Sequence, residues 1–481
     1  MRAASWRGCD RACAQESEIA GPALLFARQM QQRFLSELAE LIRFPSVSAH
    51  SRHKEDVRLC ALWLAEHLRS IGLENVAVTR TQGHPVVTAN WLHASGRPTL
   101  LIYGHYDVQP PGPLSEWETS PFTPVVRGGY VYGRGASDDK GQLFVHVKAI
   151  ESYLRTAGAL PLNVKCVFEG EEEIGSQNLA HFLRWHPQAA RADGAVISDM
   201  RILGADRPAI AESLRGALSV ELEVQGQGKD LHPGNFGGAI HGPLQALCEI
   251  IAKLHDPRGR IAIPGFYEQV RELSPIERSY MARVGPTDAQ ILRDARAKHA
   301  WGEPGFSLYE RTTIRPALTV NAIRSGDPGH SEPAVIPSKA LAMLDFRLAP
   351  EQDPDAIDRL FRQFIARIAP RTVDINVRTV FSAPSVTVAR NNFIVCAAAQ
   401  AYRKGFNARP VFMRTGGTIP VVPLLQQTWG LPVALMGFAL PDDGFHAPNE
   451  RFSLASFSRG IATSIHFLHL LGTASIRTTE L

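Results

Sequence analysis

Three apolar runs, each followed at once by acidic or histidine side chains, constrain the fold of this chain more than any other feature. They are TLLIYGHYDV (99–108), LPLNVKCVFEGEEEIGS (160–176) and DGAVISDM (193–200). Continuous apolar runs of this kind are typical of strands buried in a parallel sheet, and open α/β sheets bind ligands beyond the carboxyl ends of their strands. We therefore expect one sheet edge to present His105, Asp107, the glutamate cluster and Asp199.

The pattern changes near Arg215 to an alternation of apolar and polar residues, beginning with GALSVELEVQGQG. A period of two is typical of half-exposed antiparallel strands. It returns in ALTVNAIRSG, KALAMLDFRLAP and TVDINVRTVFSAPSV, with helical stretches at 242–254 and 353–368. The predicted fold is an α/β domain with a mixed, mainly parallel sheet flanked by helices (30–213 and 383–481), interrupted by an inserted α+β domain (214–382).

Residues 1–29 are expected to be a disordered tail or a misassigned start. A regular amphipathic helix pattern begins only with MQQRFLSELAELIRF at Met30, and the apolar piece before it is too short and too late for a signal peptide. The six cysteines of the chain include no CxxC pair, which argues against a zinc ribbon or a disulfide framework. Scattered single cysteines favour a reducing compartment, and we expect the cytoplasm.

The charge balance argues against two classes of partner. Lys and Arg number 51 against 47 Asp and Glu, and no basic stripe with interleaved aromatic residues is present. Nucleic acid is therefore not an expected partner. No run reaches the roughly 18 apolar residues of a membrane-spanning helix, so a membrane is not expected either.

Two histidines and several carboxylates gather at the strand ends and in loops that follow. Taken singly, each has a simpler explanation, such as a surface histidine, a solvated turn, an exposed loop tip or a helix cap. Taken together, they match the ligands of two divalent metal ions, because Zn²⁺ accepts imidazole nitrogen and carboxylate oxygen. Two such ions need a shared bridging carboxylate, with a histidine and an acid at each end.

The motifs GHYDVQP, YGRGASDDKGQ, EGEEEIGS, ISD, DLHPGNFGG, RTGGTIP and FHAPNE occur in this order from about residue 100 onward. On these motifs the chain resembles the M20 family of metallopeptidases, in particular the dipeptidase branch with cytosolic non-specific dipeptidase and carnosinase-like enzymes. The resemblance covers nearly the whole chain from about residue 30. It implies two divalent metal ions, with Zn²⁺ as the first choice and Mn²⁺ or Co²⁺ as alternatives.

The resemblance also implies a role for each motif residue. His105 and Asp199 would hold one ion, Glu173 and His446 the other, and Asp138 would bridge the two. Glu172 matches the general base, and Asp107 matches the acid that orients a ligand histidine. The family pattern implies a cis peptide bond between Asp138 and Asp139. Glu169 and Glu171 are left as structural acids, with Gly170 permitting the turn.

The inserted domain resembles the lid and dimerisation domain of the family. His232 would reach the active site of the partner subunit in a homodimer and stabilise the oxyanion there; from the sequence alone, a loop histidine that caps a turn is the simpler reading. Arg347 and Arg414 lie where relatives hold the substrate carboxylate, although Arg347 could equally be a strand-surface charge. Asn321 would add a polar contact, and Gly416 and Gly417 would let the backbone approach the ligand.

Two departures from the family pattern concern the substrate rather than the metals. Many relatives have Ser where this chain has Pro233, which stiffens the loop carrying His232. Relatives often read EGGSIP, whereas here Thr415 and Thr418 leave a smaller, less acidic rim.

The function implied is hydrolysis of the peptide bond in dipeptides or similar small substrates with a free carboxylate. Deacylation or desuccinylation of N-acyl amino acids, as in other members of the family, is the alternative with the same chemistry. The long stretch from IPGFYEQVRELSPIER (263–278) to RTTIRP resembles the dipeptidase branch. A binding protein without catalysis is disfavoured, because none of the ligands or the base is missing.

Overall fold

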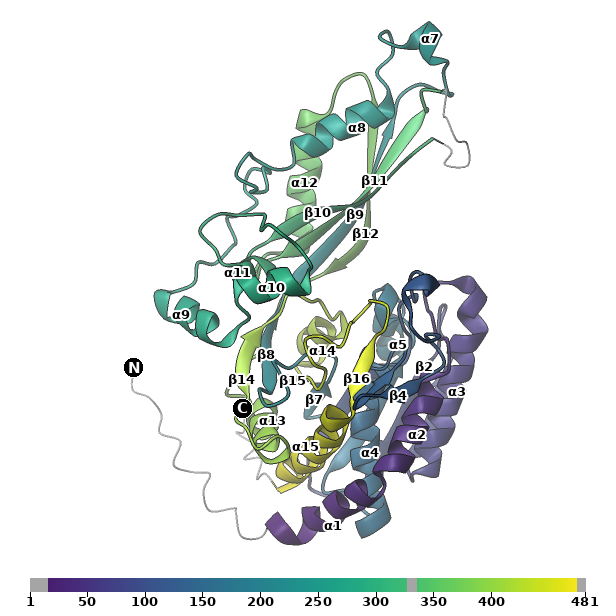
Figure 1. Ribbon diagram of the computed structural model, residues 1–481, viewed down its shortest axis with the longest axis vertical. Coiled ribbons are helices and arrows are strands. Elements are labelled where there is room, and N and C mark those ends of the chain that lie inside the picture. Colours follow the sequence, from purple (N-terminus) through teal and green to yellow (C-terminus); the bar gives the residue numbers. More distant parts are fainter. Residues whose placement is uncertain (1–15, 327–334, 474–481) are drawn as a thin grey trace. The chain divides into compact units, whose positions relative to one another are not determined.

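The computed structural model describes residues 16–326 and 335–473, and the chain forms two compact units (Figure 1). The first unit consists of the chain up to Ala211, Val388–Phe412 and Leu424 onward; the second is Glu212–Thr387 with Met413–Pro423. The boundaries expected from the sequence, 213/214 and 382/383, lie within a few residues of these. That expectation placed all of 383–481 in the first unit, whereas Met413–Pro423 returns to the second.

The expected disordered tail is contradicted for part of residues 1–29. Residues 16–29 form helix α1 (Glu16–Gln29), which packs against α4 and α15 and buries Ala20, Ala23 and Ala27. The small side chains of these alanines permit a helix that lacks the strong apolar stripe on which the expectation relied. Residues 1–15, with Cys9 and Cys13, lie outside the described residues.

A nine-stranded sheet, whose central strands belong to the first unit, includes the strand order β1-β2-β6-β3-β7-β15-β8. The strands are β1 (Glu74–Thr79), β2 (Val86–Trp91), β3 (Thr99–His105), β6 (Asn163–Glu169), β7 (Gly194–Ile197), β8 (Ala209–Leu214) and β15 (Val433–Met436), and the short strands β13 (Val386–Thr387) and β14 (Val411–Arg414) pair with β8. β6, β3, β7 and β15 are parallel neighbours, whereas β1, β2 and β8 pair antiparallel. The predicted mixed, mainly parallel sheet is confirmed.

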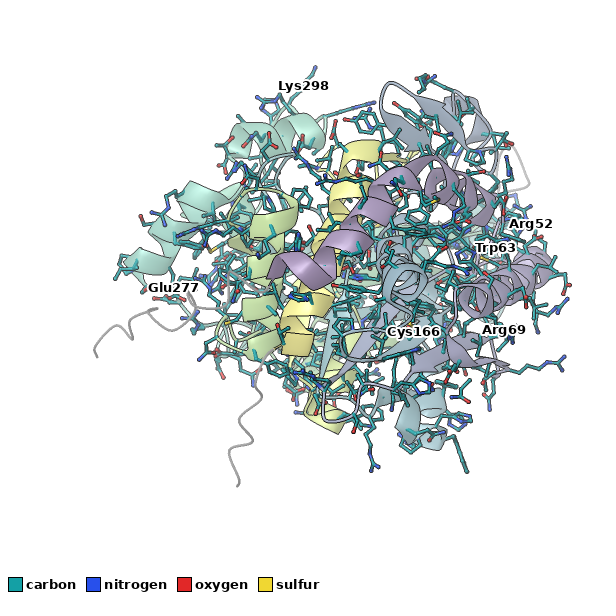
Figure 2. All side chains as sticks on the ribbon, turned by 90° about the horizontal axis from the view of Figure 1, so that it is seen from below. Arg52, Trp63, Arg69, Cys166, Glu277 and Lys298 are labelled. Carbon is teal, nitrogen blue, oxygen red and sulfur yellow. The ribbon has the colours of Figure 1, made fainter. Side chains whose placement is uncertain are left out.

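Helices cover this sheet because its central strands are apolar on both faces; every residue of β7 and β15 is buried. The helices of the first unit are α2 (Gln31–Ile42), α3 (Lys54–Ser70), α4 (Lys140–Ala157), α5 (Leu179–Trp185), α6 (Pro187–Ala190), α13 (Phe393–Gly405), α14 (Val421–Trp429) and α15 (Leu454–Thr473). α3 packs on β1 and β2, α4 on β3, and α13 on β7 and β15. Trp63 of α3, labelled in Figure 2, packs against Phe44 and Phe144 with ring centroids 6.2 Å apart in each pair.

A small antiparallel sheet with the order β16-β5-β4 also belongs to the first unit. Its strands are β4 (Val125–Arg127), β5 (Tyr130–Tyr132) and β16 (Arg451–Ser453). β5 and β16 are more than 300 residues apart in sequence, yet Tyr132 pairs with Arg451. This pairing brings the loop after β5 next to the loop before β16.

The second unit is built on an antiparallel sheet with the order β10-β11-β9-β12. Its elements are β9 (Gly216–Gln225), β10 (Ala317–Ser325), β11 (Lys339–Leu348), β12 (Asp374–Ala383), α7 (Pro233–Phe236), α8 (Pro243–Ala252), α9 (Pro275–Val284), α10 (Asp288–Asp294), α11 (Leu308–Thr313) and α12 (Pro354–Ile368). α8 and α12 pack on the sheet, and their apolar faces meet the inward side chains of β9 and β11. The alternation seen in the sequence is the burial pattern of β11, in which every second residue is buried. Within the described ranges, no helix has the length and apolarity needed to cross a membrane.

Candidate metal centre

The acidic and histidine residues of the first unit meet because of strand order. β6, β3 and β7 are parallel neighbours, so their carboxyl ends lie at one edge of the sheet. His105 ends β3, Glu172 and Glu173 follow β6 in the short 3₁₀ helix η4 (Glu172–Ile174), and Asp199 follows β7. The loop before α4 adds Asp138, and the loop before β16 adds His446.

The structure gathers these side chains into two adjacent groups. His105, Glu172 and Asp199 form one group, and Asp138, Glu173 and His446 form the other; within each, the potential ligand atoms lie within 4.8 Å of one another. The first group holds the expected pair His105 and Asp199, and the second holds the expected pair Glu173 and His446. Glu172 lies inside the first group, beside the ligands rather than apart from them.

Asp138 faces both groups at once. Its Oδ1 is 3.2 Å from His105 Nε2, and its Oδ2 is 3.0 Å from His446 Nε2. One carboxylate with an oxygen toward each group is the arrangement that a bridging ligand requires. His446 Nε2 also lies 3.2 Å from Glu173 Oε2. The peptide bond between Asp138 and Asp139 is cis, as the family pattern implies.

The site carries more negative charge than its own cations balance. Burial raises the pKa of Glu172 and of Glu173, and burial together with the Asp138 carboxylate raises the pKa of Asp199 to about 7. Burial opposes the charged form of His446, but the carboxylates of Asp138 and Glu173 outweigh it and raise the pKa of His446 to about 10. Crowded acids that resist ionisation and histidines that hold a proton both indicate a place that a cation would stabilise.

The donor atoms suit divalent metals. His105 Nε2 is buried and makes no hydrogen bond, although it faces carboxylate oxygens of Asp138 and Asp199. A buried nitrogen without a hydrogen-bond partner is costly unless something else occupies its lone pair. Imidazole nitrogens and carboxylate oxygens in two groups around a shared aspartate fit a pair of ions such as Zn²⁺, Mn²⁺ or Co²⁺.

Comparison with known proteins agrees with this geometry. Peptidase family M20/M25/M40 matches the chain over residues 101–469. The chain belongs to this family of peptidases. The M20 assignment made from the sequence motifs is therefore confirmed.

The relatives also bear out the dipeptidase branch. The chain is 29% identical over 461 residues to the Cys-Gly metallodipeptidase dug1 of Schizosaccharomyces pombe, covering 92% of this chain and 97% of that protein. It is 26% identical over 448 residues to the Beta-Ala-His dipeptidase of Rattus norvegicus, covering 89% and 91%. Among solved structures, the M20 family metallo-carboxypeptidase Sso-CP2 from Sulfolobus solfataricus matches with a TM-score of 0.82 at 30% identity, covering 91% of this chain and 99% of that one.

Asp107 positions both glutamates of this M20 site. Its Oδ1 accepts the Glu172 backbone N–H at 3.2 Å, and its Oδ2 accepts the Glu173 backbone N–H at 3.1 Å. The ring of His105 turns its Nδ1 to the Asp107 carbonyl oxygen at 3.1 Å, which directs Nε2 toward the site. The sequence predicted the contact with His105 but not the two backbone contacts.

Glu169 and Glu171 have the structural roles expected of them. Glu169 accepts hydrogen bonds from the Tyr103 hydroxyl and from Ser176 Oγ, and Glu171 accepts from the backbone N–H groups of His84 and Asn178. The explanation for Gly170 was incomplete, however. A Cβ at this position would lie 2.6 Å from the Tyr106 hydroxyl oxygen, so packing of the Tyr106 side chain excludes a larger residue.

Sequence reasoning missed two residues that contact the candidate ligands. The Gln109 amide donates to Glu173 Oε2 at 3.0 Å, and Asp139 Oδ2 accepts the His105 backbone N–H at 3.2 Å. Both stand in motifs that the sequence offered, GHYDVQP and YGRGASDDKGQ. Their closeness in sequence to the candidate ligands of the same motifs could have indicated a role. An amide or a second aspartate in a turn is, however, also common without any function.

The substrate-binding candidates and His232 all belong to the second unit. Arg347 pairs with Asp345 at 3.0 Å and donates to Thr418 Oγ1 at 3.1 Å, and its side chain stays 37% exposed. Arg414 lies between Glu212 at 3.2 Å and Glu277 at 3.3 Å, with its side chain only 14% exposed. Arg414 thus has two carboxylate partners, whereas Arg347 has one and keeps more of its side chain exposed.

The remaining candidates of this unit have local partners. Asn321 lies exposed on the edge strand β10, and its Oδ1 accepts from Thr319 Oγ1 at 3.0 Å. His232 is exposed and caps α7, with Nδ1 accepting the Gly234 N–H at 3.1 Å. A Cβ at Gly416 would lie 2.1 Å from the Thr312 carbonyl oxygen, so backbone packing within the unit requires this glycine; Gly417 has no such neighbour.

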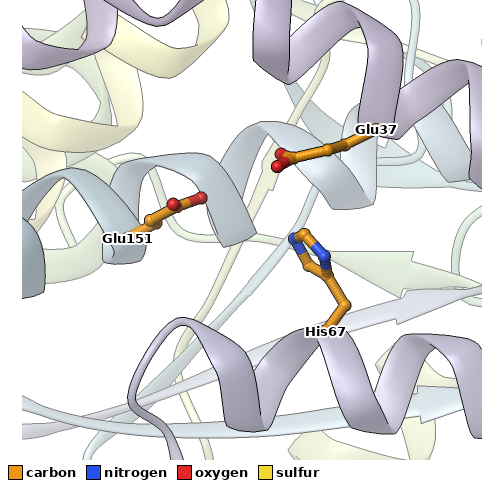
Figure 3. A group of neighbouring side chains, drawn as sticks. All are labelled: Glu37, His67 and Glu151. Atoms are coloured by element: carbon orange, nitrogen blue, oxygen red, sulfur yellow. The ribbon is translucent and has the colours of Figure 1, made fainter.

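A third cluster of the same residue types lies on helices of the first unit. Glu37 of α2, His67 of α3 and Glu151 of α4 converge, with potential ligand atoms within 4.8 Å of one another (Figure 3). The Lys148 ammonium lies 2.5 Å from Glu37 Oε2, 2.6 Å from His67 Nε2 and 2.8 Å from Glu151 Oε2. Lys148 therefore takes the place that a metal ion would need.

Proposed function

We propose that the protein is a metal-dependent dipeptidase that hydrolyses small peptides with a free carboxylate. The observation that carries the proposal is the position of Asp138, which turns one oxygen toward His105 and the other toward His446. The names of the two dipeptidase relatives support the same substrate class.

The metal ligands in this proposal are His105, Asp138, Glu173, Asp199 and His446. Zn²⁺ is the first choice, with Mn²⁺ and Co²⁺ as alternatives. When bound, a pair of such ions polarises a carbonyl group and lowers the pKa of a water molecule toward neutrality. This chemistry leaves the protein to position the peptide and to move one proton.

Glu172 would move that proton. It stands beside His105 and Asp199, and Asp107 fixes its backbone N–H. A carboxylate beside the attacking water can accept its proton and then release that proton to the leaving amine. Glu172 would thus serve first as the base and then as the acid.

The second unit would contribute to substrate binding. Arg347, with its exposed guanidinium, suits the carboxylate of a peptide. His232 of the partner subunit would stabilise the oxyanion in a homodimer formed through the second unit. The exposure of His232 and of the edge strand β10 supports this arrangement. No disulfide bond joins the described cysteines, as expected for a protein of a reducing compartment such as the cytoplasm.

A second candidate, carboxypeptidase action on longer peptides, is favoured by the 30% identity to a metallo-carboxypeptidase.

Purified protein should be assayed on a dipeptide series, a tripeptide series, N-acetyl amino acids and N-succinyl-diaminopimelate. We expect hydrolysis of dipeptides, loss of that activity after dialysis against a chelator, and its return with Zn²⁺, Mn²⁺ or Co²⁺. Release of C-terminal residues from tripeptides in preference to dipeptides would favour the carboxypeptidase. Full activity in protein verified as metal-free would overturn the proposal.

A further inference from the structure

Strand pairing places Glu450 beside the loop that carries Asp138. The antiparallel pairing of β5 with β16 continues past Tyr132 and Arg451, because the Gly133 N–H donates to the Glu450 carbonyl oxygen at 2.9 Å. The residues after Gly133 form the loop 134–139. The side chain of Glu450 points into this loop and has no exposed surface.

The Glu450 carboxylate accepts four hydrogen bonds from the loop. Oε2 accepts from Arg134 Nη1 at 2.8 Å and from the Gly135 N–H at 2.9 Å. Oε1 accepts from the Ser137 N–H at 2.9 Å and from the Asp138 N–H at 3.0 Å. Four donors fill the accepting capacity of a carboxylate. The backbone of the central aspartate is therefore fixed directly by Glu450, while the buried Arg134 guanidinium balances its charge.

The same network reaches the loop that carries His446. Ser137 Oγ donates to the Arg451 carbonyl oxygen at 2.5 Å and lies 3.3 Å from Asp443 Oδ2. The Asp443 carbonyl in turn accepts the Arg451 N–H at 2.9 Å, which closes the loop 443–451 at its base.

His446 has a backbone conformation that needs such support. Its φ is +60°, and that of Asn449 is also +60°, a left-handed region that residues other than glycine rarely adopt. The Asn449 amide ties the loop on its outer side, donating to the Glu116 carbonyl and accepting the Glu118 N–H, each at 2.8 Å. Conformations of this kind persist where the surrounding structure holds them.

We propose that Glu450 is a positioning residue that locks the Asp138 loop to the His446 loop and so sets the distances from Asp138 to His105 and His446. The inference rests on the proposed metal-dependent function. A carboxylate used only for packing would not need four donors from one loop, and an apolar side chain here would leave those donors unpaired.

The test is Glu450→Gln, which keeps the size of the side chain but replaces one oxygen with an NH₂ group that cannot accept from two of the four donors. Glu151→Gln is the matched control, because Glu151 is equally buried and ion-paired in the same unit but contacts none of the candidate ligands. Metal-free proteins would be titrated with Zn²⁺ against a chelating dye. Hydrogen–deuterium exchange of the peptide spanning 134–139 would be measured in the metal-free state.

We expect Glu450→Gln to weaken Zn²⁺ binding by about 10–100-fold, the usual effect of losing a residue that orients ligands, and to speed exchange across 134–139. Glu151→Gln should change neither. Wild-type affinity with unchanged exchange in Glu450→Gln would overturn the inference. If the wild-type protein itself binds no Zn²⁺, the proposed function fails, and the exchange measurement alone then decides whether Glu450 holds the loop.

Should Glu450→Gln not fold, Ser137→Ala removes one link of the network and should weaken Zn²⁺ binding less; unchanged affinity there would count against the inference.

Discussion

The candidate metal centre and the cluster of Glu37, His67 and Glu151 contain the same kinds of side chain but differ in what balances their charge. In the helical cluster, Lys148 contacts all three side chains, and Arg33 adds a contact to Glu151 at 2.6 Å. At the sheet edge, the cationic partners described for the acids are histidines, and no lysine or arginine contact is described for the candidate ligand atoms.

The difference teaches that ligand-type residues alone do not make a metal site. A buried carboxylate needs a cation, and the protein can supply that cation as a side chain or leave the place to an ion. The helical cluster is closed by its own lysine and serves to join three helices. No such side-chain cation is described at the sheet-edge site, whose residues lie at strand ends and in the loops that follow them.

Among the substitutions that test this comparison, the largest expected effect is on catalytic turnover. Glu172→Gln should lower kcat by about 10²–10⁴-fold, the range lost with a general acid–base group, while metal content stays at the wild-type value. Steady-state kinetics and elemental analysis of the same preparation would measure both. Near wild-type turnover would refute the assignment of Glu172 as the base.

The next largest effect is expected at the helical cluster of Glu37, His67 and Glu151, where a substitution should lower the stability of the fold. Lys148→Met should lower the free energy of unfolding by about 3–5 kcal/mol, because it leaves buried carboxylates without their main cation. Urea denaturation would measure the loss, with the exposed Lys54→Met as the control. Added Zn²⁺ should recover part of the stability, since the ligand atoms of Glu37, His67 and Glu151 lie close enough to share an ion. A variant as stable as wild type would show that Lys148 is not the balancing charge.

At the open site, the corresponding change should cost metal rather than stability. Glu173→Gln removes a charged ligand beside His446 and should reduce the metal content of dialysed protein from two ions toward one, with activity falling in proportion. Inductively coupled plasma mass spectrometry would count the ions. Retention of both ions after dialysis would remove Glu173 from the ligand set.

The smallest effect concerns pH. Burial, and then the charge of Lys148, lower the pKa of His67 to about 3. In the unfolded chain this histidine takes up a proton below about pH 6.5, whereas the folded protein does not until about pH 3. Stability is therefore lost as the pH falls through this window, by about 2 kcal/mol between pH 7 and pH 5.

Replacing the histidine isolates that contribution. His67→Asn should lose less stability than wild type between pH 7 and pH 5 in urea denaturation, since no imidazole remains to take up the proton. Arg33, Glu37 and Glu151 are present in both proteins, so the difference reports on position 67. Equal losses in the two proteins would contradict the low pKa of His67.

The sequence predicted the open site far better than the closed cluster. Each apolar run predicts a strand, and the residues at its end can be read directly from the sequence. His105, Glu173 and Asp199 stand at or just after such strand ends. Lys148 and Glu37 are separated by more than a hundred residues on different helices, where charged side chains normally face water. Only tertiary packing brings them together.

Long-range partners also explain the other differences. Arg414 was expected to lie at the substrate carboxylate; in the structure its guanidinium pairs with Glu212 and Glu277, which lie far away in sequence. Gly416 was assigned to ligand approach, whereas the Thr312 carbonyl occupies the space that a Cβ would need. A motif specifies which residue type is present, and the fold decides what that residue contacts.

The strand order of the large sheet has a consequence for synthesis on the ribosome. β15 lies between β7 and β8, yet it is translated roughly 240 residues after β7, behind almost the entire second unit. At the usual elongation rate of about 5–20 residues per second, the apolar edge of β7 remains unpaired for roughly 10–50 s before β15 is synthesised. An unpaired edge of this kind can pair with other chains, so the nascent protein is exposed to such pairing until β15 emerges.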